Sequence, residues 1–140
     1  MDFLAKRYGF RGYIASRPIG GNRIPQHVQN LVIRDYANRN GLGYLLSAAE
    51  FSIPESIIVL NDVLAELDVL EGIICYSIHM LPGDSTRRQA IISRILDAGC
   101  SLHAAVENIV IDDGTSAVSL ESIFAVDKLV DEARQILAQT

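Results

Sequence analysis

The chain has 140 residues, of which 49% are hydrophobic, and its 17 acidic and 12 basic residues give a net charge of −5 at neutral pH. A chain of this length and hydrophobic content fits one domain with a buried core, so we expect a single domain over residues 1–140. The acidic balance repels nucleic-acid phosphates on average, which argues against a protein whose main task is to coat DNA.

Neither the cysteines nor the first residues point to a secreted or membrane protein. Cys75 and Cys100 lie in or beside apolar segments and belong to no CxxC or Cys/His spacing, so we expect buried, reduced thiols and no metal site. Residues 1–10 contain no apolar run long enough for a signal peptide or a membrane span, and we interpret them as a short arm that packs on the body. We expect a cytoplasmic protein that uses no membrane and no cofactor.

In chain order, apolar runs alternate with segments of helical periodicity. The predicted strands cover residues 11–16, 43–48, 72–78 and 100–106, with a short fifth at 108–111. The predicted helices run from Pro25 to about Asn40, from the Ser52–Pro54 turn to about Asp68, from Asp84 or Ser85 to Gly99, and from about Ser119 to Ala138. This alternation predicts right-handed crossovers and a three-layer α/β sandwich with a four- or five-stranded, mainly parallel sheet.

The composition of the helices predicts how each one packs. The second helix is apolar nearly all round, which indicates that it is sandwiched between other elements. Arg87, Arg88 and Arg94 are expected on the wet face of the third helix. The last helix has a near-heptad apolar stripe made of Ile123, Val126, Val130, Ala133 and Leu137. That stripe predicts either an interface in a homo-oligomer, a dimer or tetramer, or a face packed flat on its own sheet.

The segment after the first strand has the features of an anion site. Arg17 and Arg23 flank Gly20-Gly21 just before a helix begins, so two guanidinium groups, free backbone N–H groups and a helix N-terminus can meet there. The alternative is a pair of solvated loop arginines. The expected ligand-binding residues are Ser16, Arg17, Asn22, Arg23, Gln26 and Arg87.

His79 and Glu50 are the candidates for proton transfer. His79 follows the central strand, at the sheet edge where open parallel sheets bind ligands, and its side chain changes charge near neutral pH. Glu50 follows the second strand and can supply a carboxylate base or pair with an arginine, although a helix-capping turn explains it equally well. His103 lies inside a strand and is interpreted as a core histidine.

The order of elements from about Arg11 to Leu137 resembles the catalytic domain of serine recombinases of the resolvase and invertase type, which implies a resolvase-like topology. The matching strings are the Gly12-Tyr13-Ile14 strand, the helix with Gln26, the GIICYSI strand, the Asp97–Cys100 turn and the long last helix. The chemistry of that family is not matched. Its Tyr-x-Arg-x-Ser motif falls on Tyr13, Ala15 and Arg17, and its Asp-Arg-Leu-x-Arg motif falls on residues 79–83 without either arginine.

A closer resemblance is to the sporadic carbohydrate cluster proteins of bacterial surface-polysaccharide gene clusters, carried by Gly12–Pro18 and Asn22–Gln26. It implies a protein of surface carbohydrate biosynthesis that binds an anionic sugar or nucleotide sugar, and a cofactor-free isomerase or lyase reaction would suit such a site. The alternative is a non-catalytic dimeric module that regulates or scaffolds other enzymes. A degenerate DNA-binding protein is the third reading.

Overall fold

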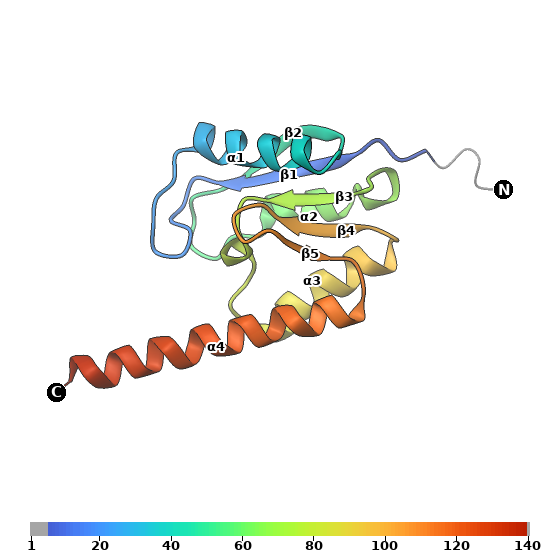
Figure 1. The fold of residues 1–140 in the computed structure, drawn as a ribbon. Coiled ribbons are helices and arrows are strands. Elements are labelled where there is room, and N and C mark those ends of the chain that lie inside the picture. The colour runs from blue at the N-terminus through green and yellow to red at the C-terminus, as the bar shows by residue number, and fades with distance from the viewer. Residues whose placement is uncertain (1–5, 140) are drawn as a thin grey trace.

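The computed structural model describes residues 6–139, and five strands in it form one sheet (Figure 1). The strands are β1 (Phe10–Ala15), β2 (Tyr44–Glu50), β3 (Gly72–Cys75), β4 (Ser101–Ala104) and β5 (Ile109–Ile111). Their order is β2-β1-β3-β4-β5, and only the β4–β5 pair is antiparallel. The predicted α/β class with a mainly parallel sheet is therefore confirmed, with five strands.

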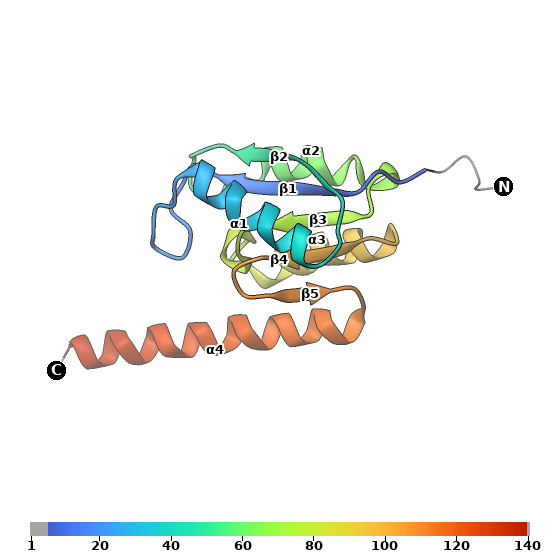
Figure 2. The same cartoon turned by 45° about the horizontal axis from the view of Figure 1, so that its top comes forward.

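Helices cover both faces of the sheet (Figures 1 and 2). One face is covered by α1 (Gln26–Arg39), and the other by α2 (Ile58–Leu64) and α3 (Ser85–Asp97). The fourth helix, α4 (Gly114–Ala138), runs along β5 and continues well past the end of the sheet (Figures 1 and 2). The result is the predicted three-layer arrangement with one helix that extends beyond it.

The core is divided by the sheet into two clusters because successive strand residues face opposite sides. In β1, Tyr13 and Ala15 pack on the side of α2 and α3, whereas Ile14 packs against α1. The central strand β3 is buried on both faces, which explains why its sequence is apolar without alternation.

The bounds of two helices differ from prediction. α2 begins at Ile58 rather than near Ser52 or Pro54, and Ile58 is 55% exposed, so the predicted sandwiching of this helix is wrong. α4 begins at Gly114 rather than Ser119, because Asp113 accepts the Ser116 N–H and the Ser116 hydroxyl accepts the Asp113 N–H. This reciprocal capping box gives the helix an additional turn at its start.

The predicted arm is described only from Lys6 onward, because residues 1–5 lie outside the described residues, and Phe10 already belongs to β1. Arg7 anchors the arm. Its guanidinium donates to the carbonyl oxygens of Leu67, Leu70 and Ala98 at 2.7 to 3.3 Å, and also to the Cys100 sulfur. One side chain thereby ties the arm to the chain on either side of α3.

The edge strand β2 contains a bulge. Arg11 of β1 pairs with Leu45, but Tyr13 pairs with Ala48, so β2 has one residue more than β1 over the same stretch. The side chain of Leu46, in the bulge, is 80% exposed, and its carbonyl oxygen accepts a hydrogen bond from the Arg11 guanidinium at 2.9 Å. Gly12 lies beneath the bulge, where a Cβ atom would overlap the Ser47 hydroxyl.

His103 of β4 is the buried core histidine that the sequence predicts. It is 7% exposed, and its Nδ1 and Nε2 atoms lie 2.7 Å from the Tyr36 hydroxyl and 3.1 Å from the Ser101 hydroxyl. Burial lowers the pKa of His103 below its usual 6.5, and the nearby charge of Asp112 opposes that shift only in part.

We expect this histidine to make the fold acid-sensitive. Above about pH 6.5, His103 is neutral in both the folded and the unfolded chain. Below that pH the unfolded chain binds a proton at His103 that the folded chain does not bind. The free energy of unfolding therefore decreases as the pH is lowered, until the lower folded-state pKa is reached. Urea unfolding between pH 7.5 and 5.5 measures the slope. A His103→Gln variant should show a shallower slope, and an equal slope in the two proteins would contradict the assignment.

Candidate functional site

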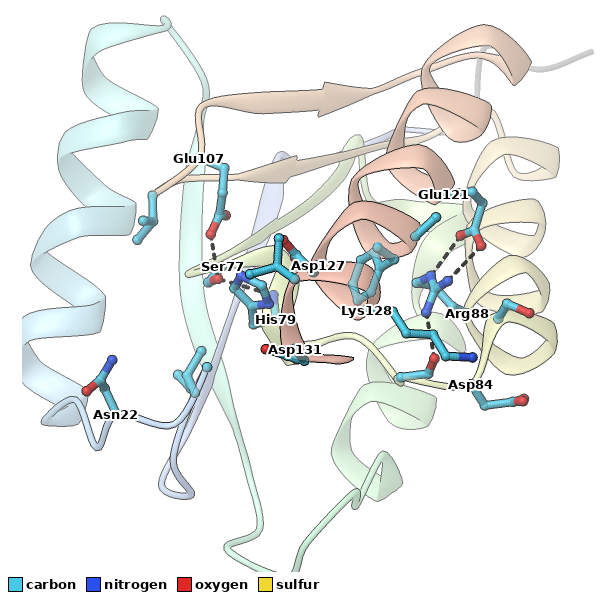
Figure 3. A pocket seen from close by; sticks show the side chains of 18 of the residues that line it. Asn22, Ser77, His79, Asp84, Arg88, Glu107, Glu121, Asp127, Lys128 and Asp131 are labelled. Carbon is cyan, nitrogen blue, oxygen red and sulfur yellow. Dashed lines mark hydrogen bonds and ion pairs between the residues drawn. The ribbon is translucent and has the colours of Figure 1, made fainter. Parts of the chain in front are cut away.

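Two hollows lie at the carboxyl edge of the parallel strands, and His79 lines both of them. The first, which we call the small pocket, has a volume of about 450 Å³ and is formed by the loops after β1, β2 and β3 and the start of α3. The second, the long groove, has a volume of about 1340 Å³ and follows α4 (Figure 3). This is the edge at which open α/β sheets bind ligands.

The small pocket brings together three of the predicted residues, Arg17, His79 and Arg87. The Arg17 guanidinium is held by the carbonyl oxygen of Ser56 at 2.6 Å. Arg87 lies in the first turn of α3, where its backbone N–H is capped by the Asp84 carboxylate. Two cationic side chains from separate elements thus face one small volume, which is also lined by the carboxylates of Glu55 and Asp84.

The glycine loop is a tight hairpin. Ile19 and Asn22 exchange both backbone hydrogen bonds, and Gly20 and Gly21 have φ values of 58° and 84°. These are the angles of a two-residue turn that needs glycine, so the glycines close a hairpin rather than wrap around an anion. Arg23 lines neither hollow, and its Nη1 lies 3.4 Å from the Ser16 carbonyl oxygen. The expected convergence of Arg17 and Arg23 on one pocket is therefore wrong.

The remaining predicted binding residues are separated. Asn22 lines the long groove, while Ser16 donates to the backbone carbonyl of Glu50 at 3.3 Å and lines neither hollow. Gln26 is exposed in the first turn of α1. The buried glutamine is Gln29, one turn later, which is 0% exposed and binds both backbone groups of Ala15. Gln29 is polar and lies in a helix whose other polar residues are mostly exposed, so its burial could not be inferred from the sequence.

Glu50 is buried, with a side chain that is 1% exposed. Five donors surround its carboxylate at 2.7 to 3.1 Å, namely the hydroxyls of Tyr13 and Ser56 and the backbone N–H groups of Phe51, Val59 and Leu60. Burial raises the pKa of this carboxyl, but the hydrogen bonds from Tyr13 and from the backbone outweigh it and hold the pKa below its usual value. Glu50 thus joins β1, β2 and the start of α2, and its role in proton transfer stays a prediction.

His79 is presented by a short 3₁₀ turn, Ile78–Met80, that follows β3. Glu107, in the loop after β4, holds this turn by accepting the Ser77 hydroxyl at 2.6 Å and the Ile78 N–H at 2.9 Å (Figure 3). The His79 side chain is exposed, and its ring centre lies 6.3 Å from that of Phe124 in α4. A titratable imidazole therefore sits at the boundary between the small pocket and the long groove.

Arg88 is buried, and the expectation that it lies on a wet helix face is wrong. Only 3% of it is exposed, and its Nε and Nη2 atoms pair with both carboxylate oxygens of Glu121 in α4 at 2.7 Å (Figure 3). Its Nη1 donates to the carbonyl oxygens of Pro82 and Gly83. Sequence reasoning missed this residue because its carboxylate partner lies 33 positions away.

The long groove is acidic. Its ionisable lining residues, apart from His79, are six acids (Asp84, Glu107, Glu121, Asp127, Asp131, Glu132) and three bases (Arg88, Lys128, Arg134). The excess of acids repels phosphate groups, so an anionic ligand is better accommodated in the small pocket. Within residues 6–139, no group of three or more His, Cys, Asp or Glu side chains is arranged to hold a metal ion.

Two solved structures resemble this fold. A resolvase family site-specific recombinase from Streptococcus pneumoniae is 10% identical, with a TM-score of 0.62, and the match covers 92% of this chain and 95% of that one. The N-terminal catalytic domain of TP901-1 integrase is 13% identical, with a TM-score of 0.51, over 88% of this chain and 98% of that one. The likeness establishes the fold alone.

The predicted resolvase-like topology is confirmed by these structures. No family model and no curated protein matches the sequence. None of the helices in residues 6–139 combines the length and the hydropathy that crossing a bilayer requires.

Proposed function

We propose that this protein binds an anionic sugar or nucleotide sugar through a phosphate or carboxylate group held in the small pocket. The observation that carries the proposal is the meeting of Arg17, His79 and Arg87, from three separate elements, around about 450 Å³. That volume lies in the usual range of small-molecule sites, roughly 300–1,000 Å³. Arginine suits this task because its planar fork of donors matches a phosphate or carboxylate with two parallel hydrogen bonds.

The chemistry that fits such a site is proton transfer. An exposed imidazole beside a bound sugar can remove a proton next to a carbonyl group. It can return that proton to another atom of the sugar in isomerisation, or give it to the oxygen that leaves as the C–O bond breaks in elimination. His79 would be the catalytic residue. A place in the cytoplasmic biosynthesis of surface carbohydrates is proposed on the resemblance of Gly12–Pro18 and Asn22–Gln26 to the sporadic carbohydrate cluster proteins.

Two observations weigh against DNA as the ligand, although both similar structures are recombinases or integrases by name. The long groove beside α4 carries more acids than bases. In addition, Arg17 occupies the position of the serine in the Tyr-x-Arg-x-Ser motif of the serine recombinases. Its guanidinium donates a hydrogen bond to the Ser56 carbonyl oxygen. A nucleophile and a basic surface are the two features that strand cleavage needs, which favours a small ligand.

Ligand binding is tested by isothermal titration with UDP-glucuronic acid, glucose 1-phosphate, inorganic phosphate and a short DNA duplex. We expect a sugar phosphate or a nucleotide sugar to bind, and Arg87→Ala to weaken binding at least tenfold because it removes a charge-assisted contact. Arg94→Ala is the matched control, since Arg94 is exposed seven residues along the same helix. The proposal would be overturned if only the DNA duplex binds, or if Arg87→Ala and Arg94→Ala weaken ligand binding equally.

Proton transfer is tested separately by NMR in D₂O with the sugar that binds. The wild-type protein should exchange a carbon-bound hydrogen of the sugar for deuterium, and His79→Gln should bind the sugar without this exchange. Exchange at the wild-type rate in the variant would remove His79 from the mechanism while leaving the binding site in place.

A second candidate function, a dimeric binding module, is favoured by the outer half of α4. Its apolar residues Val126, Leu129, Val130 and Ile136 are 42 to 64% exposed, and the polar positions between them include Asp127, Lys128, Asp131, Glu132 and Arg134. A membrane is a poor occupant for this face, because surface-bound helices are typically basic and this polar face is acidic. We propose that a second copy of the chain covers it.

Dimerisation is tested by light scattering during gel filtration at about 50 μM, a concentration we choose to populate a weak dimer. The wild-type protein should elute with twice the mass of the chain, and Leu129→Glu should elute as a monomer because it places a charge in the apolar face. Lys128→Glu, at the neighbouring polar position, should not change the mass. A monomeric wild-type protein would contradict the proposal.

A further inference from the structure

We infer that Arg88 positions the wall of the small pocket and ties it to α4, so that the placement of α4 sets the affinity of the pocket. The inference deepens the proposed ligand site and rests on it for the identity of the pocket's occupant. It makes Arg88 a positioning residue, because this side chain lies behind the pocket wall and is absent from the residues that line the pocket.

On one side, Arg88 holds the loop that forms part of the pocket. Its Nη1 donates to the carbonyl oxygens of Pro82 and Gly83 at 2.9 and 3.0 Å, and both residues line the small pocket together with Asp84. Asp84 in turn caps α3, the helix that presents Arg87 to the pocket. A shift of the guanidinium therefore moves the loop and a proposed ligand-binding residue together.

On the other side, Arg88 is held by α4 alone. Both carboxylate oxygens of Glu121 accept from its Nε and Nη2 atoms at 2.7 Å, and the Phe124 ring lies 3.8 Å from its Cζ atom. Figure 3 shows the guanidinium between the Glu121 carboxylate and the loop at Asp84. One buried side chain thus forms an ion pair with α4 and donates further hydrogen bonds to the carbonyl oxygens of the pocket wall.

The other core contacts of α4 lie in its first half, where Leu120 is buried and Ala117, Ile123 and Phe124 pack against the body. Residues 128–139 are all exposed, and the outer part of α4 extends past the sheet (Figures 1 and 2). A displacement of α4 must either break the Arg88–Glu121 pair, leaving a buried cation without its partner, or carry Arg88 and the loop with it. Because a buried cation without its carboxylate is strongly unfavourable, the second is favoured.

A second contact leads from α4 to the pocket. The Phe124 ring packs near His79, whose side chain lines the small pocket, with ring centres 6.3 Å apart. Phe124 and Glu121 lie three residues apart, on the same face of α4, so one movement of the helix changes both contacts. Binding of a second copy to α4 and binding of a ligand to the pocket would then alter each other by the same factor.

The test compares two variants of α4 that remove the same charge. Glu121→Gln weakens the fork with Arg88, and Asp131→Asn, an exposed position farther along α4, is the matched control. Backbone NMR of each full-length variant reports the amide signals of Gly83 and Asp84 and the ring signals of His79. Isothermal titration at 20 °C with UDP-glucuronic acid, glucose 1-phosphate and inorganic phosphate reports affinity.

We expect Glu121→Gln to shift or broaden the NMR signals of Gly83, Asp84 and His79. The same variant should raise the dissociation constant of the bound probe at least threefold. Asp131→Asn should change neither the signals nor the dissociation constant. Changes confined to α4 and Arg88, or an unchanged dissociation constant, would overturn the inference even if Glu121→Gln lowers the melting temperature. If no probe binds the wild-type protein while the Gly83 and His79 signals respond, Arg88 does position the pocket wall, but the proposed ligand and the control of its affinity by α4 both fail.

Discussion

Glu50→Gln is expected to destabilise the protein more than any other single exchange discussed for this chain. The carboxylate accepts five hydrogen bonds inside the fold, and an amide would turn an NH₂ group toward some of those donors. Each buried donor left without an acceptor costs about 1–3 kcal/mol, so we expect the free energy of unfolding to fall by roughly 3 kcal/mol or more. Urea unfolding at pH 7 measures the loss.

The pH dependence of the same variant separates the charge of Glu50 from its shape. The pKa of the Glu50 carboxyl in the folded state lies below the usual 4.5. Its ionised form therefore stabilises the fold above pH 4.5, and this stabilisation is lost as the pH falls through the folded-state pKa. Glu50→Gln should therefore lose less stability between neutral and acid pH than the wild-type protein. The variant should still lose some, because the pKa values of Asp113 and Glu121 are also lowered in the folded state.

Glu71→Gln is the control for this experiment, since Glu71 is an exposed glutamate just before β3. It removes the same charge at the surface and should change stability by no more than about 0.5 kcal/mol. If the two variants unfold at the same urea concentration, the hydrogen bonds around Glu50 do not stabilise the fold as described.

Gln29→Met is expected to have the second largest effect, a loss of about 2–4 kcal/mol in the free energy of unfolding. The Gln29 side chain accepts from the Ala15 N–H at 3.0 Å and donates to the carbonyl oxygens of Ala15 and Ile24 at 2.7 and 2.8 Å. Methionine keeps the approximate shape of the side chain but leaves the backbone groups of Ala15, at the end of β1, and the Ile24 carbonyl, just before α1, without this partner.

Gln26→Met provides the comparison, because Gln26 lies one turn earlier in α1 and is exposed. We expect it to unfold at the wild-type urea concentration. Amide hydrogen exchange adds a local measurement, since Gln29→Met should speed exchange at Ala15 more than in the middle of β3. Slow exchange at Ala15 in that variant would show that water or another group replaces the glutamine.

The layers of the fold could be predicted because they depend on patterns local in sequence. The uninterrupted apolar run at residues 72–75 is typical of a strand covered on both faces, and the structure buries all of it. His103 followed from its place inside a strand. The alternation of strands and helices was sufficient to predict a mainly parallel sheet with helices on both faces, since crossovers are right-handed.

The candidate site could be predicted only in part, because its geometry depends on distant partners. Arg17, His79 and Arg87 do share a pocket, as their positions after strands and at a helix start indicated. Arg88, next to Arg87 in sequence, is buried because Glu121 faces it from another helix. Gly20-Gly21 was misread because the same two residues suit an anion loop and a two-residue hairpin, and only the φ angles distinguish them.

The bulge in β2 bears on whether a further strand can add to the edge of the sheet. An exposed edge strand ordinarily offers an evenly spaced row of backbone groups on which a further strand can grow. At Leu46 the row is interrupted, and the Arg11 guanidinium already occupies that carbonyl oxygen. The bulge therefore disfavours extension of the sheet at this edge, and with it fibre-like polymerisation across β2.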